Sequence, residues 1–138
     1  MIAAELRLGN WVNTIVSDKP SIVTFIKSQK VKDGYYQSIE LNEEEIYIPQ
    51  HICGIPLTAD ILERAGFEMK TGSDGIHYEN KECWIYILKD KFELELNTGS
   101  ERVNLYRNWK YLHQLQNLYF ALTGEELTIN LLSASAAR

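Results

Sequence analysis

The sequence predicts an α+β fold. A small, bent N-terminal β-sheet or SH3-like barrel is followed by a short capped helix, then by an antiparallel β-meander that a C-terminal amphipathic helix covers. Short β-branched and aromatic runs alternate with turn signals over the first 50 residues and again over residues 76–106, which is typical of strands. Two other segments carry apolar residues at helical spacing together with residues typical of helix ends.

The length and charge of the chain bound its organisation and its partners. The chain has 138 residues and a formal net charge of −5. This length favours a single domain over residues 1–138, with a β-rich part at 1–50, an α+β part at 55–131 and a tail at 132–138. A net negative charge disfavours duplex nucleic acid as a partner. Since the sequence shows no secretory signal and no apolar segment long enough to span a bilayer, we expect a cytoplasmic protein without membrane contact.

Four short strands are expected in the N-terminal part, because β-rich runs there lie between turn signals. The dipeptide Asp33-Gly34 suits the two central positions of a tight hairpin turn, where positive φ angles are required. The expected strands are Trp11 to Val16, Ile22 to Ile26, Tyr35 to Leu41 and Ile46 to Ile48.

The middle of the chain predicts a helix and then a meander. Thr58 is a typical N-cap residue, Gly66 is typical of a position just past a helix end, and the helix between them should cover about Ala59 to Ala65. The expected strands of the meander are Ile76 to Tyr78, Cys83 to Leu88, Phe92 to Leu96 and Val103 to Tyr106.

A second helix is predicted from about Asn108 to Thr123, and Gly124 is the expected residue after its end. The segment from Glu126 to Leu131 is interpreted as an edge strand. Six apolar residues of the helix fall within one arc, which should face a sheet: Tyr111, Leu112, Leu115, Leu118, Tyr119 and Leu122.

No catalytic residue, metal site or cofactor is predicted. Structural zinc sites usually show two closely spaced ligand pairs, and this chain has none. Cys53 and Cys83 are interpreted as reduced thiols packed as small hydrophobic side chains. The glycines form no phosphate-binding loop, and neither a nucleophile elbow nor a zinc-protease helix motif occurs. A hydrolase that uses Cys83 or a pair of acidic residues is the least favoured function.

The outer face of the second helix is the candidate binding surface. It carries amide, imidazole and aromatic groups where a solvated helix usually carries Lys and Glu, and a partner would cover the exposed aromatic area. An alternative interpretation is that these groups bind the N-terminal sheet of the chain itself and cap its backbone. The candidate residues are His113, Gln114, Gln116, Asn117 and Phe120, with Trp109 and Tyr36 as aromatic anchors.

A second set of residues suits single-stranded nucleic acid. Bases stack on aromatic rings, and lysines contact phosphates. In this interpretation the rings are Tyr35, Tyr36 and Trp84, and the lysines lie between Lys27 and Lys32. The alternatives are that such rings pack in the core of a sheet, or that they form an ordinary protein interface.

Three stretches resemble a family of small uncharacterised proteins encoded in Bacteroidota genomes, their phages and their prophages. They are ELRLGNWV at 5–12, IPLT at 55–58 with the Gly66-Phe67 pair that follows, and YLHQLQNLYFALTGEEL at 111–127. The resemblance implies a phage or prophage setting and no activity. By analogy with other small phage proteins, we expect a non-enzymatic binding protein that acts stoichiometrically. Its partner would be a host or virion protein or a small nucleotide-like ligand, with an anti-defence role as one form of this. A homo-oligomer also fits, and a single-stranded nucleic-acid-binding accessory protein is the alternative.

Overall fold

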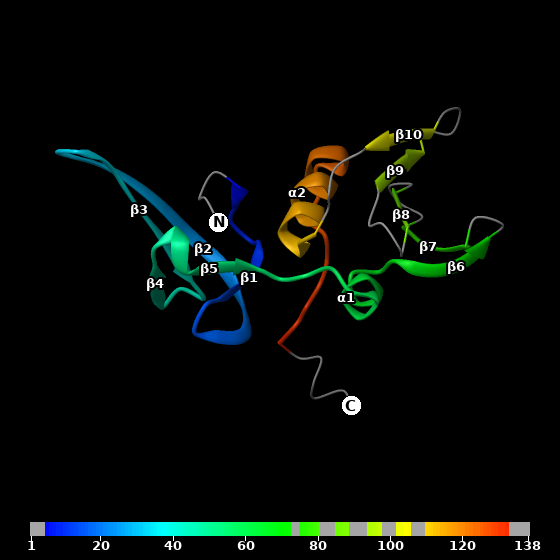
Figure 1. Ribbon diagram of the computed structural model, residues 1–138, viewed down its shortest axis with the longest axis horizontal. Coiled ribbons are helices and arrows are strands. Elements are labelled where there is room, and N and C mark those ends of the chain that lie inside the picture. The colour runs from blue at the N-terminus through cyan, green and yellow to red at the C-terminus, as the bar shows by residue number, and fades with distance from the viewer. Residues whose placement is uncertain are drawn as a thin grey trace. The chain divides into compact units, whose positions relative to one another are not determined.

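The computed structural model describes residues 5–72, 75–80, 85–88, 94–97, 102–105 and 110–132. The chain divides into two compact units (Figure 1). The first unit comprises Met1–Pro56 with Tyr111–Asn117, and the second comprises Leu57–Lys110 with Leu118–Arg138. The expectation of a single domain stays a prediction.

The first unit is built on an antiparallel sheet of five strands in the order β4-β3-β2-β1-β5. The sheet is open, with β4 and β5 at its two edges, so the strands form no closed SH3-like barrel, whereas the α+β class is confirmed. The strand β5, which follows a 3₁₀ turn at Pro49–His51, was not expected from the sequence. The bounds are β1 Trp11–Thr14, β2 Ser17–Val31, β3 Gly34–Leu41, β4 Glu45–Tyr47 and β5 Ile52–Gly54.

Strands β2 and β3 form a hairpin that is longer than the rest of the sheet. Their pairing runs from Val23 opposite Leu41 to Val31 opposite Gly34, whereas β1 pairs only with residues 17–22 of β2 and β4 pairs only with residues 39–41 of β3. Residues 27–38 therefore have no strand partner in the sheet other than each other. We call this segment the hairpin arm, and Figure 1 shows it, in blue and cyan, running away from the other strands of its sheet.

The turn of the arm differs by one residue from the expected one. Lys32 and Asp33 occupy its two central positions, and Gly34 is already paired with Val31. Gly34 has a φ of 145°, which a residue with a side chain rarely adopts. The glycine therefore supplies its conformational freedom at the first position of β3, after the turn.

A cluster of buried aliphatic side chains joins four strands of the first unit, β1, β2, β3 and β5. Burying one such aliphatic side chain contributes roughly 1.5–3 kcal/mol, so this cluster stabilises the sheet through packing alone. Ile26 and Tyr47 pack against the cluster and are themselves partly buried. The cluster comprises Leu6, Val12, Val23, Ile39, Leu41 and Ile52.

The second unit begins with the predicted capped helix, α1 (Ala59–Arg64). The hydroxyl oxygen of Thr58 accepts a hydrogen bond from the backbone N–H of Ile61 at 3.2 Å. Asp60 in the first turn forms an ion pair of 2.8 Å with Arg64, and Gly66 has a φ of 88° directly after the helix. The N-cap and the stop signal that the sequence predicts are thus confirmed.

The sheet of the second unit is the predicted antiparallel meander, with the order β10-β9-β8-β7-β6. Its first strand, β6, was not expected from the sequence. Buried side chains of this unit come from its helices, strands and loops, and include Leu62, Phe67, Tyr78, Tyr119 and Leu127. The strands are β6 Glu68–Gly72, β7 Gly75–Asn80, β8 Ile85–Leu88, β9 Leu94–Asn97 and β10 Arg102–Leu105.

Helix α2 (Leu112–Thr123) confirms the predicted C-terminal helix and its end before Gly124, whose φ is 73°. Its first residues were expected earlier, from Asn108, but residues 106–109 lie outside the described residues. The expected edge strand at 126–131 is absent from the described residues, and that prediction was wrong. The side chain of Asn130 accepts from the N–H of Leu132 at 2.9 Å, a local bond that competes with strand pairing.

A close approach in the first unit yields a stability prediction. A Cβ atom on Gly54 would lie 2.5 Å from two ring carbons of Tyr111, too close for any tolerated contact. We therefore expect Gly54→Ala to lower the free energy of unfolding by about 1–3 kcal/mol, the usual cost of overpacking. Urea unfolding followed by circular dichroism measures this loss. Gly72→Ala is the control, since its Cβ would meet only His77 at 3.8 Å, and an equal loss in both variants contradicts the prediction.

Candidate functional site

Gln116 lies on the helix face that the sequence singles out, and its side chain is only 2% exposed. Its Oε1 accepts a hydrogen bond of 2.9 Å from the backbone N–H of Trp11, and its Nε2 donates one of 3.2 Å to the carbonyl of Gly9. One amide therefore satisfies both a donor and an acceptor of the N-terminal segment, in the way a neighbouring strand would.

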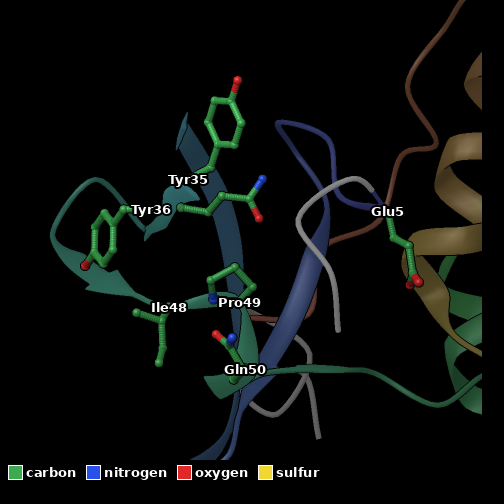
Figure 2. A pocket seen from close by; sticks show the side chains of 7 residues that line it. Glu5, Tyr35, Tyr36, Ile48, Pro49 and Gln50 are labelled. Atoms are coloured by element: carbon green, nitrogen blue, oxygen red, sulfur yellow. The ribbon is translucent and has the colours of Figure 1, made fainter. Parts of the chain in front are cut away.

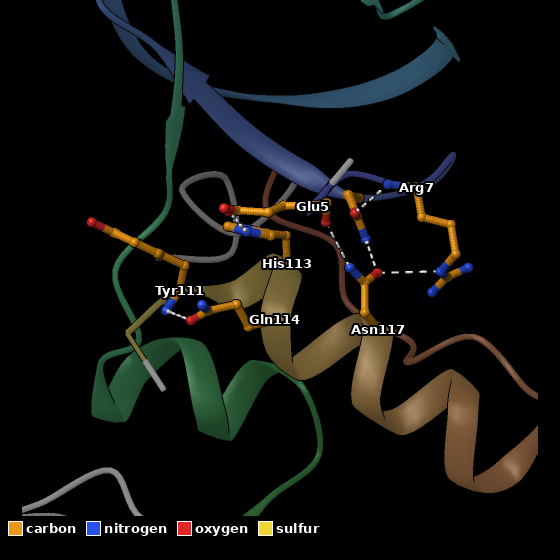
Figure 3. A network of polar contacts seen from close by, with 7 residues as sticks. Glu5, Arg7, Tyr111, His113, Gln114 and Asn117 are labelled. Carbon is orange, nitrogen blue, oxygen red and sulfur yellow. Dashed lines mark hydrogen bonds and ion pairs between the residues drawn. The ribbon is translucent and has the colours of Figure 1, made fainter. Parts of the chain in front are cut away.

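Asn117 continues this network one residue later (Figure 3). Its Oδ1 accepts from Nδ2 of Asn10 at 2.9 Å and from Nε of Arg7 at 3.2 Å, while its Nδ2 donates to the carbonyl of Glu5 at 3.0 Å. Gln116 and Asn117 thus bind the N-terminal segment of the chain itself, as the alternative interpretation of this helix face expects. As contacts for a partner they stay a prediction.

His113 is fully buried in the first unit. Its ring stacks on the ring of Tyr111 with centroids 5.7 Å apart, and its Nε2 lies 3.7 Å from Oε2 of Glu5. Neither ring nitrogen has a hydrogen-bond partner. Burial lowers the pKa of His113 below its usual value, and the nearby Glu5 carboxylate opposes that shift. The neighbouring Gln114 accepts a hydrogen bond of 3.1 Å from the backbone N–H of Tyr111.

The lowered pKa of His113 predicts a pH-dependent stability. The folded protein binds a proton at His113 less readily than the unfolded chain does, so stability should fall as the pH drops through the ordinary histidine pKa of about 6.5. We expect His113→Phe to reduce the difference between the urea midpoints at pH 7.5 and pH 5.5. Phenylalanine keeps an aromatic ring at this position and removes the titratable nitrogens, together with the approach of 3.7 Å between Nε2 and Glu5. An unchanged pH dependence in this variant contradicts the assignment.

Of the three aromatic candidates, two lie within the described residues, one in each unit. Trp109 lies outside the described residues. Phe120 is 39% exposed on the part of α2 that belongs to the second unit. Tyr36 is 49% exposed on β3 of the first unit, in the hairpin arm. Tyr36 lines a pocket of the first unit.

That pocket lies beside residues 35–37 of β3, within the hairpin arm, and has a volume of about 620 Å³. Figure 2 shows the rings of Tyr35 and Tyr36 leaving the strand in different directions, with Pro49 and Gln50 below them in this view. The ring of Tyr35 is 72% exposed. The lining residues are Glu5, Tyr35, Tyr36, Gln37, Ile48, Pro49 and Gln50.

Sequence reasoning found part of this site. It selected the two tyrosines for their ring chemistry, but it did not place residues 48–50 beside them, because that contact joins segments that are distant in the sequence. The 3₁₀ turn that begins at Pro49 positions Gln50 at the pocket, with Pro49 at an early helical position, where its missing N–H costs nothing. An isolated proline between two strands was the only local signal.

The arm is also the most basic exposed part of the first unit. Lys27, Lys30 and Lys32 are exposed, and Asp33 is the only acidic residue between positions 27 and 38. Three lysines and one aspartate give the arm a net charge of +2, whereas the whole chain carries −5. Lys30 pairs directly opposite Tyr35, so an ammonium group and an aromatic ring share one face of the hairpin.

A second pocket, of about 440 Å³, lies in the second unit beside Gly66 and Tyr119. Three charged side chains that line it have partners within the chain, and two of these pairs join opposite charges. Arg64 pairs with Asp60, Glu68 pairs with Lys70 at 3.1 Å, and Glu79 lies 3.5 Å from His77. Because these charges are already engaged, this pocket is a weaker candidate than the one at the arm.

Within the described ranges, no three His, Cys, Asp or Glu side chains lie together as metal ligands. Cys53 is a half-buried free thiol, and Cys83 lies outside the described residues. In the same parts of the chain, no helix has both the length and the apolar character needed to cross a membrane. Comparisons with protein-family models, with curated proteins and with solved structures found no match to this chain.

Proposed function

We propose that this protein is a non-enzymatic binding protein and that the hairpin arm, with the pocket beside its residues 35–37, is its contact element. In this proposal the protein acts stoichiometrically in the cytoplasm of a host cell, as the product of a phage or prophage. The candidate surface on α2 is secondary, because two of its amides already bind the N-terminal segment.

The observation that carries the proposal is the exposure of the arm on both faces. Residues 27–36 are all exposed, and they include the two tyrosine rings. A two-stranded hairpin without a further layer is marginally stable in water, and the arm has no other strand beside it. Exposed aromatic area of this kind is typical of a surface that a partner covers.

The lysines of the arm have an ordinary explanation, because charged side chains on exposed strand edges prevent aggregation. This explanation does not extend to Tyr35 and Tyr36, because large exposed rings on a strand would favour aggregation. Phenol rings, amides and ammonium groups together provide stacking, hydrogen bonding and ionic attraction, which are the interactions of a binding site.

Site-specific photo-cross-linking in host cells tests this proposal. A benzophenone amino acid replaces Tyr35 in one variant and Ile46, which is 68% exposed on the edge strand β4, in the control. We expect position 35 to give one discrete adduct, and position 46 to give none. Equal adducts from both positions, or none from position 35, contradict the proposal. Nuclease and protease treatment of the adduct then identifies the class of partner.

A further inference from the structure

We infer that the partner of the hairpin arm is single-stranded nucleic acid, whose bases stack on the tyrosines and whose phosphates contact the lysines. This inference rests on the proposed function and adds the class of ligand to it. It concerns unpaired strands, because a base can stack on a protein ring only when its face is not covered within a duplex.

The stacking surfaces are Tyr35 and Tyr36. They occupy consecutive positions of β3, so their side chains leave opposite faces of the hairpin. Both rings are accessible, at 72% and 49% exposure. Stacking on an aromatic side chain is worth about 1–3 kcal/mol per base and tolerates any base, so two rings suffice for binding without sequence preference.

The lysines provide complementary charge on both faces. Lys30 lies opposite Tyr35 on one face, Lys27 lies opposite Ser38 on the face of Tyr36, and Lys32 lies in the turn. The arm carries a net charge of +2 within a chain of −5, which makes it a local site of attraction for a polyanion. A protein partner would also use the tyrosines, whereas single-stranded nucleic acid uses both the rings and the lysines beside them, and only one carboxylate in the arm opposes it.

The pocket beside residues 35–37 of the arm suits the edge of a stacked base. Gln37 and Gln50 line it, and each amide both donates and accepts hydrogen bonds, as base edges require. Its volume of about 620 Å³ falls within the usual range for small-ligand sites. Glu5 also lines the pocket, and its carboxylate would repel phosphates. The sugar-phosphate backbone of the nucleic acid should therefore lie away from Glu5 and near the lysines of the arm.

Fluorescence anisotropy of the full chain with labelled 12-nucleotide single strands, of DNA and of RNA, tests the inference. We expect binding at low salt, weaker binding to the corresponding duplex, and a loss of roughly 5- to 150-fold on Tyr35→Ala, with a similar loss on Tyr36→Ala. Tyr35→Phe and Tyr36→Phe should retain binding, because phenylalanine keeps the stacking surface.

The salt dependence tests the lysines separately. Three phosphate contacts on a single strand predict a slope of about −2 for the logarithm of affinity against the logarithm of salt concentration. Replacing Lys27, Lys30 and Lys32 with glutamine should bring the slope close to zero. Lys19→Gln is the matched charge control, and Phe25→Thr, which removes a half-exposed ring of β2 outside the arm, is the matched aromatic control.

Three results would overturn the inference: no binding of either strand at low salt, equal affinity for the duplex, or losses in the control variants as large as those in the arm variants. If a mononucleotide displaced the labelled oligonucleotide at equal concentration, the ligand would be a small molecule, and this result would also contradict the inference. A protein adduct from position 35 without binding of nucleic acid would reject this inference while leaving the proposed function intact. If neither the cross-linking nor the anisotropy experiment gives its expected result, both the proposed function and this inference are rejected.

Discussion

Replacing Gln116 with alanine is expected to lower the free energy of unfolding by roughly 2–5 kcal/mol. The substitution removes the amide that accepts from the N–H of Trp11 and donates to the carbonyl of Gly9. Loss of the bond to the buried N–H of Trp11 costs about 1–3 kcal/mol, and truncation of a buried side chain adds the cost of the cavity that it leaves. The loss should be large because Gln116 is almost completely buried, which limits replacement of the amide by water.

Urea unfolding of the purified variant measures this effect, and Gln114→Ala is its matched control. Both substitutions exchange the same residue types within α2, so the change in helix propensity is common to them. Gln114 is only half-buried, and its side-chain oxygen accepts a hydrogen bond from the backbone N–H of Tyr111, three residues earlier. A loss in Gln116→Ala that is no larger than that in Gln114→Ala would show that the contact with the N-terminal segment contributes little.

Replacing Ile39 with alanine is the second change with a large expected effect, a loss of about 2–5 kcal/mol. Ile39 is fully buried in the cluster of the first unit and lies opposite Ile26, at the point where the arm joins the sheet. The substitution removes apolar contacts and leaves a cavity, because the paired strands restrict collapse around it. The base of the arm would lose its packing.

The control is Ile46→Ala on β4, since Ile46 is largely exposed and its truncation should change stability by less than about 0.5 kcal/mol. Thermal or urea unfolding of both variants provides the comparison. Similar stabilities for the two variants would mean that the cluster around Ile39 does not hold the sheet together.

Local signals predicted the elements whose causes are local. The cap at Thr58 and the stops at Gly66 and Gly124 depend on a few adjacent residues, and the structure has all three. The hairpin was predicted from Asp33-Gly34, but the turn is centred one residue earlier, because pairing along the whole of β2 and β3 sets the register. Turn chemistry alone does not determine a register that long-range pairing imposes.

The elements that the sequence did not predict depend on distant contacts. The strand β5 has only three residues and forms by pairing with β1, some 40 positions earlier. Helical periodicity placed Gln116 and Asn117 on a polar face, but it could not show that residues 5–11 would bind them. Both cases illustrate tertiary contacts that decide a structure where local preference is weak.

The candidate site was predictable in its chemistry and not in its position. The tyrosines and lysines of residues 27–36 were selected as a nucleic-acid-binding set from their residue types. Their exposure on a two-stranded arm follows from strand lengths that no local pattern defines, since β4 pairs no further along β3 than Ile39 and β1 pairs no further along β2 than Ile22. The pocket adds Pro49 and Gln50 from a turn after β4.

Hydroxyl-radical footprinting of the protein inside its host cells is the most direct test of the claim that the arm is the contact element. Oxidation of Tyr35 and Tyr36 would be compared with that of Phe25, which is 52% exposed on the same hairpin but outside the arm. Relative to Phe25, both tyrosines should be oxidised readily in the purified protein and protected in cells. If the oxidation of the tyrosines relative to Phe25 were the same in the purified protein and in cells, the arm would not be the contact element.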